Sequence, residues 1–370
     1  MDNFKKLAKN LVNYSCRIKK GEKVLIEQKE IDPEFVVSLI KEIHKVGAYP
    51  FVVNLNEIIS RQLLLGTDET YAKLKTKYML PMMQDMDAYI GLMGSNNIFE
   101  ISDVPAKQKS LNNMYYHKPV HFQERVNNTK WVLLRWPNMS MAQNANMSTD
   151  AFEEIFFNVC TLNYRKMDKA MDNLVSLMQK TDKVKLISPN TSLTFSIKGQ
   201  PAIKCSGQNN IPDGEVFAGP IKYSINGVIS YNIPTIYDGI RFDNVTLTIK
   251  DGKIINASSY NNTVKLNQIL DTDDGSRYFG EFAIGVNPFI TMPILDILFD
   301  EKMCGSFHFT PGGCYDESFN GNKSAIHWDM VLCQLPEYGG GEIYFDDVLI
   351  RKDGIFVVEE LKCLNPEMLV

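Results

Sequence analysis

The sequence predicts an α/β N-terminal domain with a mostly parallel sheet over residues 1–180 and a β-rich (α+β) C-terminal domain over residues 181–370. Three observations lead to this fold class. The first half alternates between strand-like and helical patterns, which is typical of a parallel sheet connected by helices. The second half contains pairs of alternating runs joined by tight turns, which is typical of antiparallel hairpins. The length of 370 residues exceeds the usual size of a single hydrophobic core.

Strand-like runs and helical patterns follow one another through the first half. The expected strands cover residues 23–28, 50–55, 87–95 and 131–137. The expected helices cover residues 1–20, 33–46, 59–80, 104–118, 149–159 and 164–182. Asp32 suits the N-cap of the second helix and Pro33 its first position, while Gly47 ends that helix. A strand, a helix and a strand within about thirty residues form a βαβ unit, so the first two strands should be parallel.

The character of the sequence changes near residue 180, where we place the domain boundary. The runs KVKLISPN and TSLTFSIKG alternate in hydrophobicity and meet at a Pro-Asn turn. Clearer hairpins cover residues 245–259 and 342–358, each with an Asp-Gly pair as its turn. One helix is expected at residues 262–272, so the second half is mainly antiparallel β-structure.

The composition narrows the functional class. A net charge of −5, spread along the chain, argues against nucleic acid as the main partner. No apolar run is long enough to span a bilayer, and the first residues lack the apolar core of a secretory signal. The seven cysteines are scattered and form no CxxC pair, which favours reduced thiols. We therefore expect a cytoplasmic protein with no membrane and no nucleic-acid partner.

The α/β half carries no motif for a nucleotide. Neither a GxGxxG run nor a GxxxxGK[ST] loop follows any of its expected strands. His117 and His121 are four residues apart, which suits a pair of metal ligands on one helix. Pro119 lies between them and should break that geometry, so we do not expect a metal site there.

The residues suited to metal chemistry gather in the second half, around residues 304–331. His327 and Asp329 are two positions apart, so on a strand their side chains would share one face. A histidine and a carboxylate on one face, with another histidine nearby, is a credible start for a metal site, although a structural pair is the alternative. With two glutamates in segments rich in Gly, Pro and Asn, the candidate set is Glu215, Glu281, His308, His327 and Asp329.

Two imidazoles and three carboxylates are too many ligands for one tetrahedral zinc ion. They suit two divalent ions, Zn, Co or Mn, held about 3.5–4 Å apart with a carboxylate between them. Such ions make hydroxide available near neutral pH and polarise a carbonyl group. Tyr315 follows His308 by seven residues and could donate a hydrogen bond to the resulting oxyanion. Cys304 and Cys314 flank His308 and are conceivable soft ligands, but small buried thiols beside a site are commoner.

A series of motifs around these residues gives the sequence a family resemblance. In chain order they are GEKVLIE, WPNMSMAQ, IPDGEVFAGP, FGEFAIGVNP, CGSFHFTPGGCY, SAIHWDMV and GGEIYFDDVLIRKDGIF. In this order and at these separations they resemble the thermophilic aminopeptidase family, dinuclear metallo-aminopeptidases that include aminopeptidase T, AmpS and PepS. The resemblance implies metal ligands at Glu215, Glu281, His308, His327 and Asp329, and a catalytic tyrosine at Tyr315. It also implies that the β-rich domain is the catalytic domain and that the protein is a homodimer.

The expected function is hydrolysis of the N-terminal peptide bond of peptides with a free N-terminus. Glu281 or Glu215 would carry a proton to the leaving amine. An alternative is a dinuclear metallohydrolase that acts on another ester or amide. Arg277 and Arg351 are isolated in the sequence, so no arginine cluster is expected to clamp a phosphate. A non-catalytic peptide-binding protein is a third hypothesis, but it would tolerate loss of these residues, and all six positions are intact.

Overall fold

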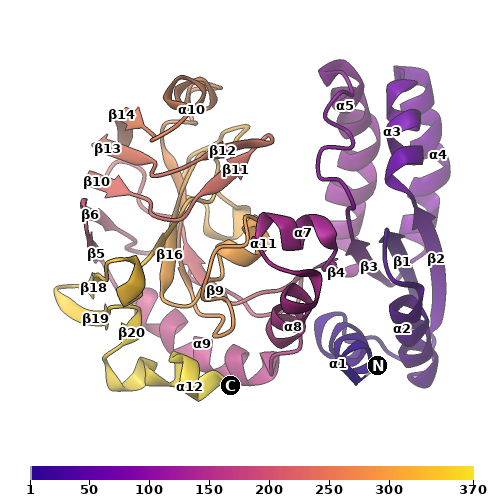
Figure 1. The fold of residues 1–370 in the computed structure, drawn as a ribbon, viewed down its shortest axis with the longest axis horizontal. Helices are drawn as coiled ribbons and strands as arrows, with labels where there is room; N and C mark the ends of the chain where they lie inside the picture. The colour runs from indigo at the N-terminus through magenta and orange to yellow at the C-terminus, as the bar shows by residue number, and fades with distance from the viewer. Residues whose placement is uncertain (1) are drawn as a thin grey trace. The chain divides into compact units, whose positions relative to one another are not determined.

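The structure is a computed structural model that describes residues 2–370 and divides into two compact units (Figure 1). The first unit runs to Thr161 and includes Gly207–Pro212, and the second comprises Leu162–Ser206 and Asp213–Val370. Compactness does not test independent folding, so the domain boundary near residue 180 stays a prediction.

A five-stranded parallel sheet forms the centre of the first unit, in the order β2-β1-β3-β4-β8. Its strands are β1 (Lys23–Lys29), β2 (Tyr49–Leu55), β3 (Ala88–Met93), β4 (Lys130–Arg135) and β8 (Asn210–Ile211). The middle strand β3 is buried over all but its last residue, as expected for a parallel sheet covered on both faces. The predicted parallel sheet is confirmed. The short strand β8 was not predicted, because two residues carry no periodic signal.

The helices of the first unit depart from the predicted bounds in several places. They are α1 (Asp2–Asn10), η1 (Leu11–Ser15), α2 (Pro33–Lys45), α3 (Glu57–Leu65), α4 (Glu69–Gln84), α5 (Ala106–Asn112), η2 (Asn113–Arg125), α6 (Val126–Asn128), α7 (Met139–Asn144) and α8 (Thr149–Cys160). The first predicted helix, 1–20, already ends at Ser15. The predicted helix 59–80 is two helices, because the Asp68 side chain caps a new N-terminus by accepting from the Tyr71 amide.

The helix η2 has π-helical geometry and continues through Pro119. Our expectation that Pro119 would break the helix between His117 and His121 is therefore wrong, since the chain passes the proline in the wider π-helical form. The two imidazole rings lie 5.4 Å apart between centroids, and His121 is buried. Neither histidine belongs to a candidate metal group among residues 2–370.

Antiparallel sheets dominate the second unit, as predicted. One has eight strands in the order β14-β13-β10-β6-β5-β18-β19-β20, one has five in the order β17-β16-β15-β9-β7, and β11 pairs with β12. The strands are β5 (Lys183–Ser188), β6 (Thr191–Ser196), β7 (Ile203–Cys205), β9 (Glu215–Ala218), β10 (Asn226–Ser230), β11 (Thr235–Tyr237), β12 (Ile240–Phe242), β13 (Thr246–Lys250), β14 (Lys253–Ser258), β15 (Phe279–Gly285), β16 (Ser306–Pro311), β17 (Val331–Cys333), β18 (Glu342–Phe345), β19 (Val348–Lys352) and β20 (Ile355–Phe356).

Few helices accompany these sheets. They are α9 (Tyr164–Met178), α10 (Thr263–Leu270), α11 (Ile297–Asp300), η3 (Asp316–Ser318), η4 (Pro336–Tyr338), η5 (Glu359–Leu364) and α12 (Pro366–Leu369). The helix α10 confirms the helix predicted at 262–272. The hairpin β13-β14 is also confirmed, and Asp251 and Gly252 at its turn have φ angles of 48° and 81°, as a two-residue turn with two left-handed positions requires.

The five-stranded antiparallel sheet is the part of the fold that matters for the site. Every residue of β9, β15, β16 and β17 is buried. Phe279 and Phe309 pack with ring centroids 4.5 Å apart on neighbouring strands of this sheet. Side chains that project from these strands are therefore held by a well-packed core.

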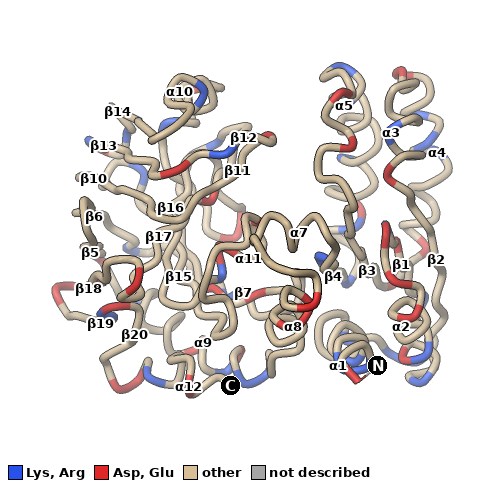
Figure 2. Tube along the Cα trace, viewed as in Figure 1, with Lys and Arg blue, Asp and Glu red and all other residues tan. Residues whose placement is uncertain are grey.

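Charged residues of both signs are interspersed along the elements of each unit, as Figure 2 shows. The net charge of −5 is thus not concentrated in one element. Over residues 2–370, each helix is too short or too polar to cross a membrane.

Candidate metal centre

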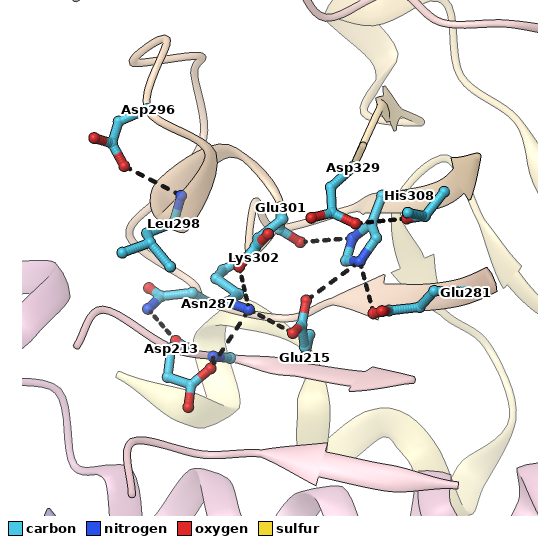
Figure 3. Close-up of polar contacts among 12 residues, drawn as sticks. Asp213, Glu215, Glu281, Asn287, Asp296, Leu298, Glu301, Lys302, His308 and Asp329 are labelled. Carbon is cyan, nitrogen blue, oxygen red and sulfur yellow. Dashed lines mark hydrogen bonds and ion pairs between the residues drawn. The ribbon is translucent and has the colours of Figure 1, made fainter. Parts of the chain in front are cut away.

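Three neighbouring strands carry three of the predicted ligands on one face of the sheet. Glu281 lies in β15, whose residues Ala283 and Gly285 point to the same side. Glu215 in β9 is the register partner of Gly285, and His308 in β16 is the partner of Ala283. Residues directly opposite each other in antiparallel strands share a face, so the three side chains converge (Figure 3).

His327 and Asp329 reach the same place from the segment that returns beside β16. His327 forms an isolated bridge with Gly312, and the amide of Trp328 donates to the carbonyl of Pro311 at 3.1 Å. The ring of Trp328, which lies between these two residues in sequence, packs against Phe242 with centroids 5.0 Å apart. The alternation along this extended segment puts His327 and Asp329 on one side, as the sequence predicted.

The five side chains form a continuous row of close contacts. The Nε2 atom of His308 lies 3.1 Å from Oε1 of Glu281 and 3.5 Å from Oε2 of Glu215. The Nε2 atom of His327 lies 3.1 Å from Oδ1 of Asp329 and 3.4 Å from Oε2 of Glu281. Glu281 is therefore the middle residue of the row.

These contacts define two groups with the spacing of metal ligands. One is formed by Glu215, Glu281 and His308, and the other by Glu281, His327 and Asp329. The ligand atoms within each group lie within 4.8 Å of one another. Both groups contain Glu281, so its carboxylate is the one that can bridge two ions.

Three polar atoms in these groups are buried without a hydrogen bond: Oε2 of Glu215, Oε2 of Glu281 and Nε2 of His327. Buried polar atoms in native proteins are almost always satisfied, and each one that is not needs an explanation. Cations bound to carboxylate oxygen and imidazole nitrogen would satisfy all three. The residues present therefore fit a metal centre.

Backbone carbonyls fix the orientation of both imidazoles. Nδ1 of His308 lies 3.2 Å from the carbonyl oxygen of Glu301, and Nδ1 of His327 lies 2.7 Å from that of Gly313. A carbonyl oxygen can only accept, so each Nδ1 carries a hydrogen and donates it. Each Nε2 then faces the carboxylates, as is usual for metal-binding histidines held from behind.

The carboxylates shift the pKa values of the histidines when no cation lies between them. Burial lowers the pKa of His308, but the hydrogen bond to Glu281 and the charge of Glu215 outweigh it and raise that pKa to about 9. The pKa of His327 is also raised, because Asp329 and Glu281 outweigh the effect of burial. The pKa of Asp329 is lowered, since the charge of His327 outweighs burial. Metal binding at this centre must therefore displace protons.

Tyr315 lies at the edge of this centre. Its ring packs on His327 with centroids 4.7 Å apart and on Phe217 with centroids 5.8 Å apart. Half of its surface is exposed. Desolvation of the phenol and the charge of Asp329 raise its pKa, so Tyr315 stays protonated and can donate a hydrogen bond.

The sequence analysis missed a buried lysine beside the centre. Lys302 is 2% exposed, and its Nζ contacts Glu215 directly, lies 2.5 Å from Oε1 of Glu301 and 3.7 Å from Oδ1 of Asp213 (Figure 3). Burial raises the pKa of Glu301, and Lys302 opposes that shift. One feature of the sequence could have indicated it, namely the charged run Asp300-Glu301-Lys302 just before an apolar strand. Lys302 lies six residues before His308.

The two cysteines considered as soft ligands do not join the centre. Neither Cys304 nor Cys314 belongs to a candidate metal group in residues 2–370. Cys205 does, because it forms a third group with Asp213 and Glu215. No motif in the sequence singles out Cys205, which comes ten residues before Glu215.

Comparison with known proteins places the chain in a family. A family model described as thermophilic metalloprotease (M29) matches residues 1–338. The chain belongs to the M29 thermophilic metalloprotease family. As an M29 member it is a metallopeptidase and thus a hydrolase, which confirms the enzyme class expected from the motifs. Aminopeptidase AmpS of Bacillus subtilis (strain 168) is 23% identical over 380 residues, covering 91% of this chain and 91% of that relative.

Solved structures show that the fold is shared. AmpT from Thermus thermophilus matches this M29 chain with a TM-score of 0.79 at 18% identity, covering 96% of this chain and 99% of that one. A 2,5-dihydroxypyridine dioxygenase from Pseudomonas putida KT2440 matches with a TM-score of 0.63 at 14% identity, covering 97% and 98%. Because the second protein is named as a dioxygenase, the fold alone does not determine the reaction.

Proposed function

We propose that this M29 metallopeptidase is an aminopeptidase with two divalent ions, held by Glu215, Glu281, His308, His327 and Asp329. The observation that carries the proposal is the pair of ligand groups that share Glu281 and contain three buried atoms without hydrogen bonds. The names of the curated relatives, which are aminopeptidases, support the choice of exopeptidase. The ligand set of nitrogen and oxygen suits Zn, Co or Mn.

The charge of the centre supports two ions. The carboxylates around the centre are Asp213, Glu215, Glu281, Glu301 and Asp329. The ammonium of Lys302 pairs with Asp213, Glu215 and Glu301. If all five carboxylates are ionised and both histidines are neutral, these groups and Lys302 together carry four negative charges, which two divalent ions offset. Buried carboxylates without such compensation are costly.

When bound, the ions supply an activated water and polarise the carbonyl of the scissile bond. One of the two glutamates, Glu281 or Glu215, is proposed to accept the proton of that water and to pass it to the leaving amine. The hydroxyl of Tyr315 donates a hydrogen bond to the oxygen that becomes negative in the tetrahedral state. His308 and His327 keep their Nε2 atoms toward the centre, because Nδ1 of each is held by a carbonyl oxygen.

The substrates are proposed to be peptides with a free N-terminus, whose amine binds at the centre beside the scissile carbonyl. A requirement for that amine would confine the enzyme to the N-terminal peptide bond. The homodimer and the cytoplasmic location expected from the sequence remain part of this proposal. Size measurement in solution tests the first, and cell fractionation tests the second.

The test compares free and blocked amines before and after metal removal. The protein is treated with a chelator and assayed on leucine- and arginine-p-nitroanilide and on acetyl-leucine-p-nitroanilide, then reloaded with Co²⁺, Zn²⁺ or Mn²⁺. Activity that returns with metal and only on the free-amine substrates supports the aminopeptidase. A folded protein that binds two ions but cleaves neither kind of substrate contradicts it and favours a hydrolase for another ester or amide.

A further inference from the structure

The candidate ligands form three overlapping groups rather than two. The third group, Cys205, Asp213 and Glu215, shares Glu215 with the group that contains His308. Its ligand atoms also lie within 4.8 Å of one another. By spacing and residue type alone, this group is as suited to a divalent ion as the other two, and its thiol would favour a soft ion such as Zn²⁺ or Cd²⁺.

A side chain of the protein already provides a positive charge at the third group. The ammonium of Lys302 contacts Glu215 and lies 3.7 Å from Oδ1 of Asp213, which are two of the three members. Lys302 is 2% exposed, so the surrounding protein and not the solvent determines where its ammonium lies. Asn287 links the main chain at Lys302 to the main chain at Asp213. Its backbone amide donates to the Lys302 carbonyl at 3.0 Å, and its side-chain amide donates to the Asp213 carbonyl at 2.8 Å.

We propose that Lys302 is a built-in cation that takes the place of a third metal ion and limits the centre to two. The proposal rests on the proposed function, because it assumes that the other two groups hold ions. A third divalent ion bound to Asp213 and Glu215 would lie close to the ammonium of Lys302. Two positive charges so close together repel each other strongly inside a low-dielectric core. With Lys302 in place, the Cys205 thiol is not a metal ligand.

Lys302 also decides how Glu215 can bind its ion. The ammonium holds Oε1 of Glu215, whereas Oε2 has no hydrogen bond and lies 3.5 Å from Nε2 of His308. Glu215 therefore offers one oxygen to the ion beside His308. Lys302 acts through Glu215 and does not touch the substrate, so it is a positioning residue.

Cadmium binding tests the proposal, because a cadmium–thiolate bond has its own ultraviolet absorption. The variants are Lys302→Ala, which opens the third group, and Lys302→Ala with Cys205→Ser, which removes its thiolate. The wild type should bind two Cd²⁺ ions without a band that depends on Cys205. Lys302→Ala should bind three and show the band, and the double variant should lose the band. Glu301→Gln is the matched control, since it touches the ammonium but belongs to no ligand group, and it should keep two ions.

Two ions and no thiolate band in folded Lys302→Ala would overturn the role of Lys302 and leave the dinuclear centre intact. A wild type that binds fewer than two ions would overturn the proposed function itself. Circular dichroism shows whether Lys302→Ala folds. If it does not, the single variant Cys205→Ser decides: unchanged cadmium binding and absorption relative to the wild type support the proposal, and a lost band or a lost ion overturns it.

Discussion

Nε2 of His308 lies 3.1 Å from Oε1 of Glu281, while Nδ1 of the same ring donates to the carbonyl of Glu301. A neutral His308 held in this way turns a lone pair toward a carboxylate, and two acceptors at that distance repel each other. A positive charge must therefore sit between them, as a proton on His308 or as a metal ion. The close approach of these two residues is the local reason why metal and protons compete at this centre.

Metal binding should therefore release protons at neutral pH. In the metal-free protein the pKa of His308 is raised to about 9 and that of His327 is raised as well, so both rings are protonated at pH 7. We expect about two protons released when the centre fills, one from each imidazole. Calorimetric titration of the apo protein in buffers of different ionisation enthalpy measures this number directly. A binding enthalpy that does not change between buffers contradicts the prediction.

Glu281→Gln should affect both ions, and Asp329→Asn only one. The two substitutions are matched, because each replaces a carboxylate with an amide of the same shape. Glu281 belongs to both ligand groups and Asp329 to one. Loss of the shared carboxylate should lower the binding affinity for each ion by at least roughly a hundredfold. A hundredfold is the upper range for residues that only support a ligand. Metal content after dialysis against limiting Zn²⁺ checks this, and equal losses in the two variants would show that Glu281 is not shared.

The sequence predicted the two kinds of sheet and singled out the five side chains that the structure brings together, because both leave short-range signals. His327 and Asp329 share a face through simple strand alternation. The turns at Asp251-Gly252 and Asp353-Gly354 carry Asp-Gly pairs, which tolerate left-handed backbone. The motifs identified Glu215, Glu281 and His308. Which of them meet, and that Glu281 is in the middle, depends on the register of β9, β15 and β16, which no local pattern encodes.

The features that the sequence did not predict also have physical causes. Lys302 is a long charged side chain, normally found at the surface, and only its partners Glu215 and Glu301 explain its burial. Strand β8 joins the first sheet through two residues that lie about seventy-five positions after β4, so its place is fixed by tertiary pairing alone. Pro119 does not end its helix, because the segment around it is π-helical and the steric rule for proline holds for ordinary α-helices.

Tyr315→Phe should slow the reaction without emptying the centre. The hydroxyl is proposed to act on the oxyanion, which exists only beyond the ground state, so kcat should fall by roughly 10²–10³-fold with KM little changed. The phenylalanine ring can keep the packing on His327 and Phe217. Steady-state kinetics with leucine-p-nitroanilide and a metal determination on the same sample check both statements. A variant with full kcat would remove Tyr315 from the mechanism.

The first unit should lose stability in mild acid because of a buried histidine far from the metal groups in sequence. His121 is 8% exposed, and Nε2 lies 3.3 Å from the hydroxyl of Tyr116. Burial, together with the nearby charges of His117 and Arg125, lowers the pKa of His121 to about 3. The unfolded chain takes up this proton near its ordinary pKa of about 6.5, and the folded chain does not. Stability therefore falls as the pH drops below that value.

For one such group the linkage amounts to about 2 kcal/mol between pH 7 and pH 5. His121→Phe removes the titrating ring, so its unfolding free energy should fall less over this interval than that of the wild type, by up to that amount. Tyr116→Phe is the matched control, because it removes the hydroxyl partner of His121 but nothing that titrates in this range. It should lower stability at both pH values and leave the difference between them unchanged. Urea unfolding of the chelated protein at the two pH values measures all three, and a His121→Phe variant with the wild-type difference would mean that His121 is protonated in the folded chain.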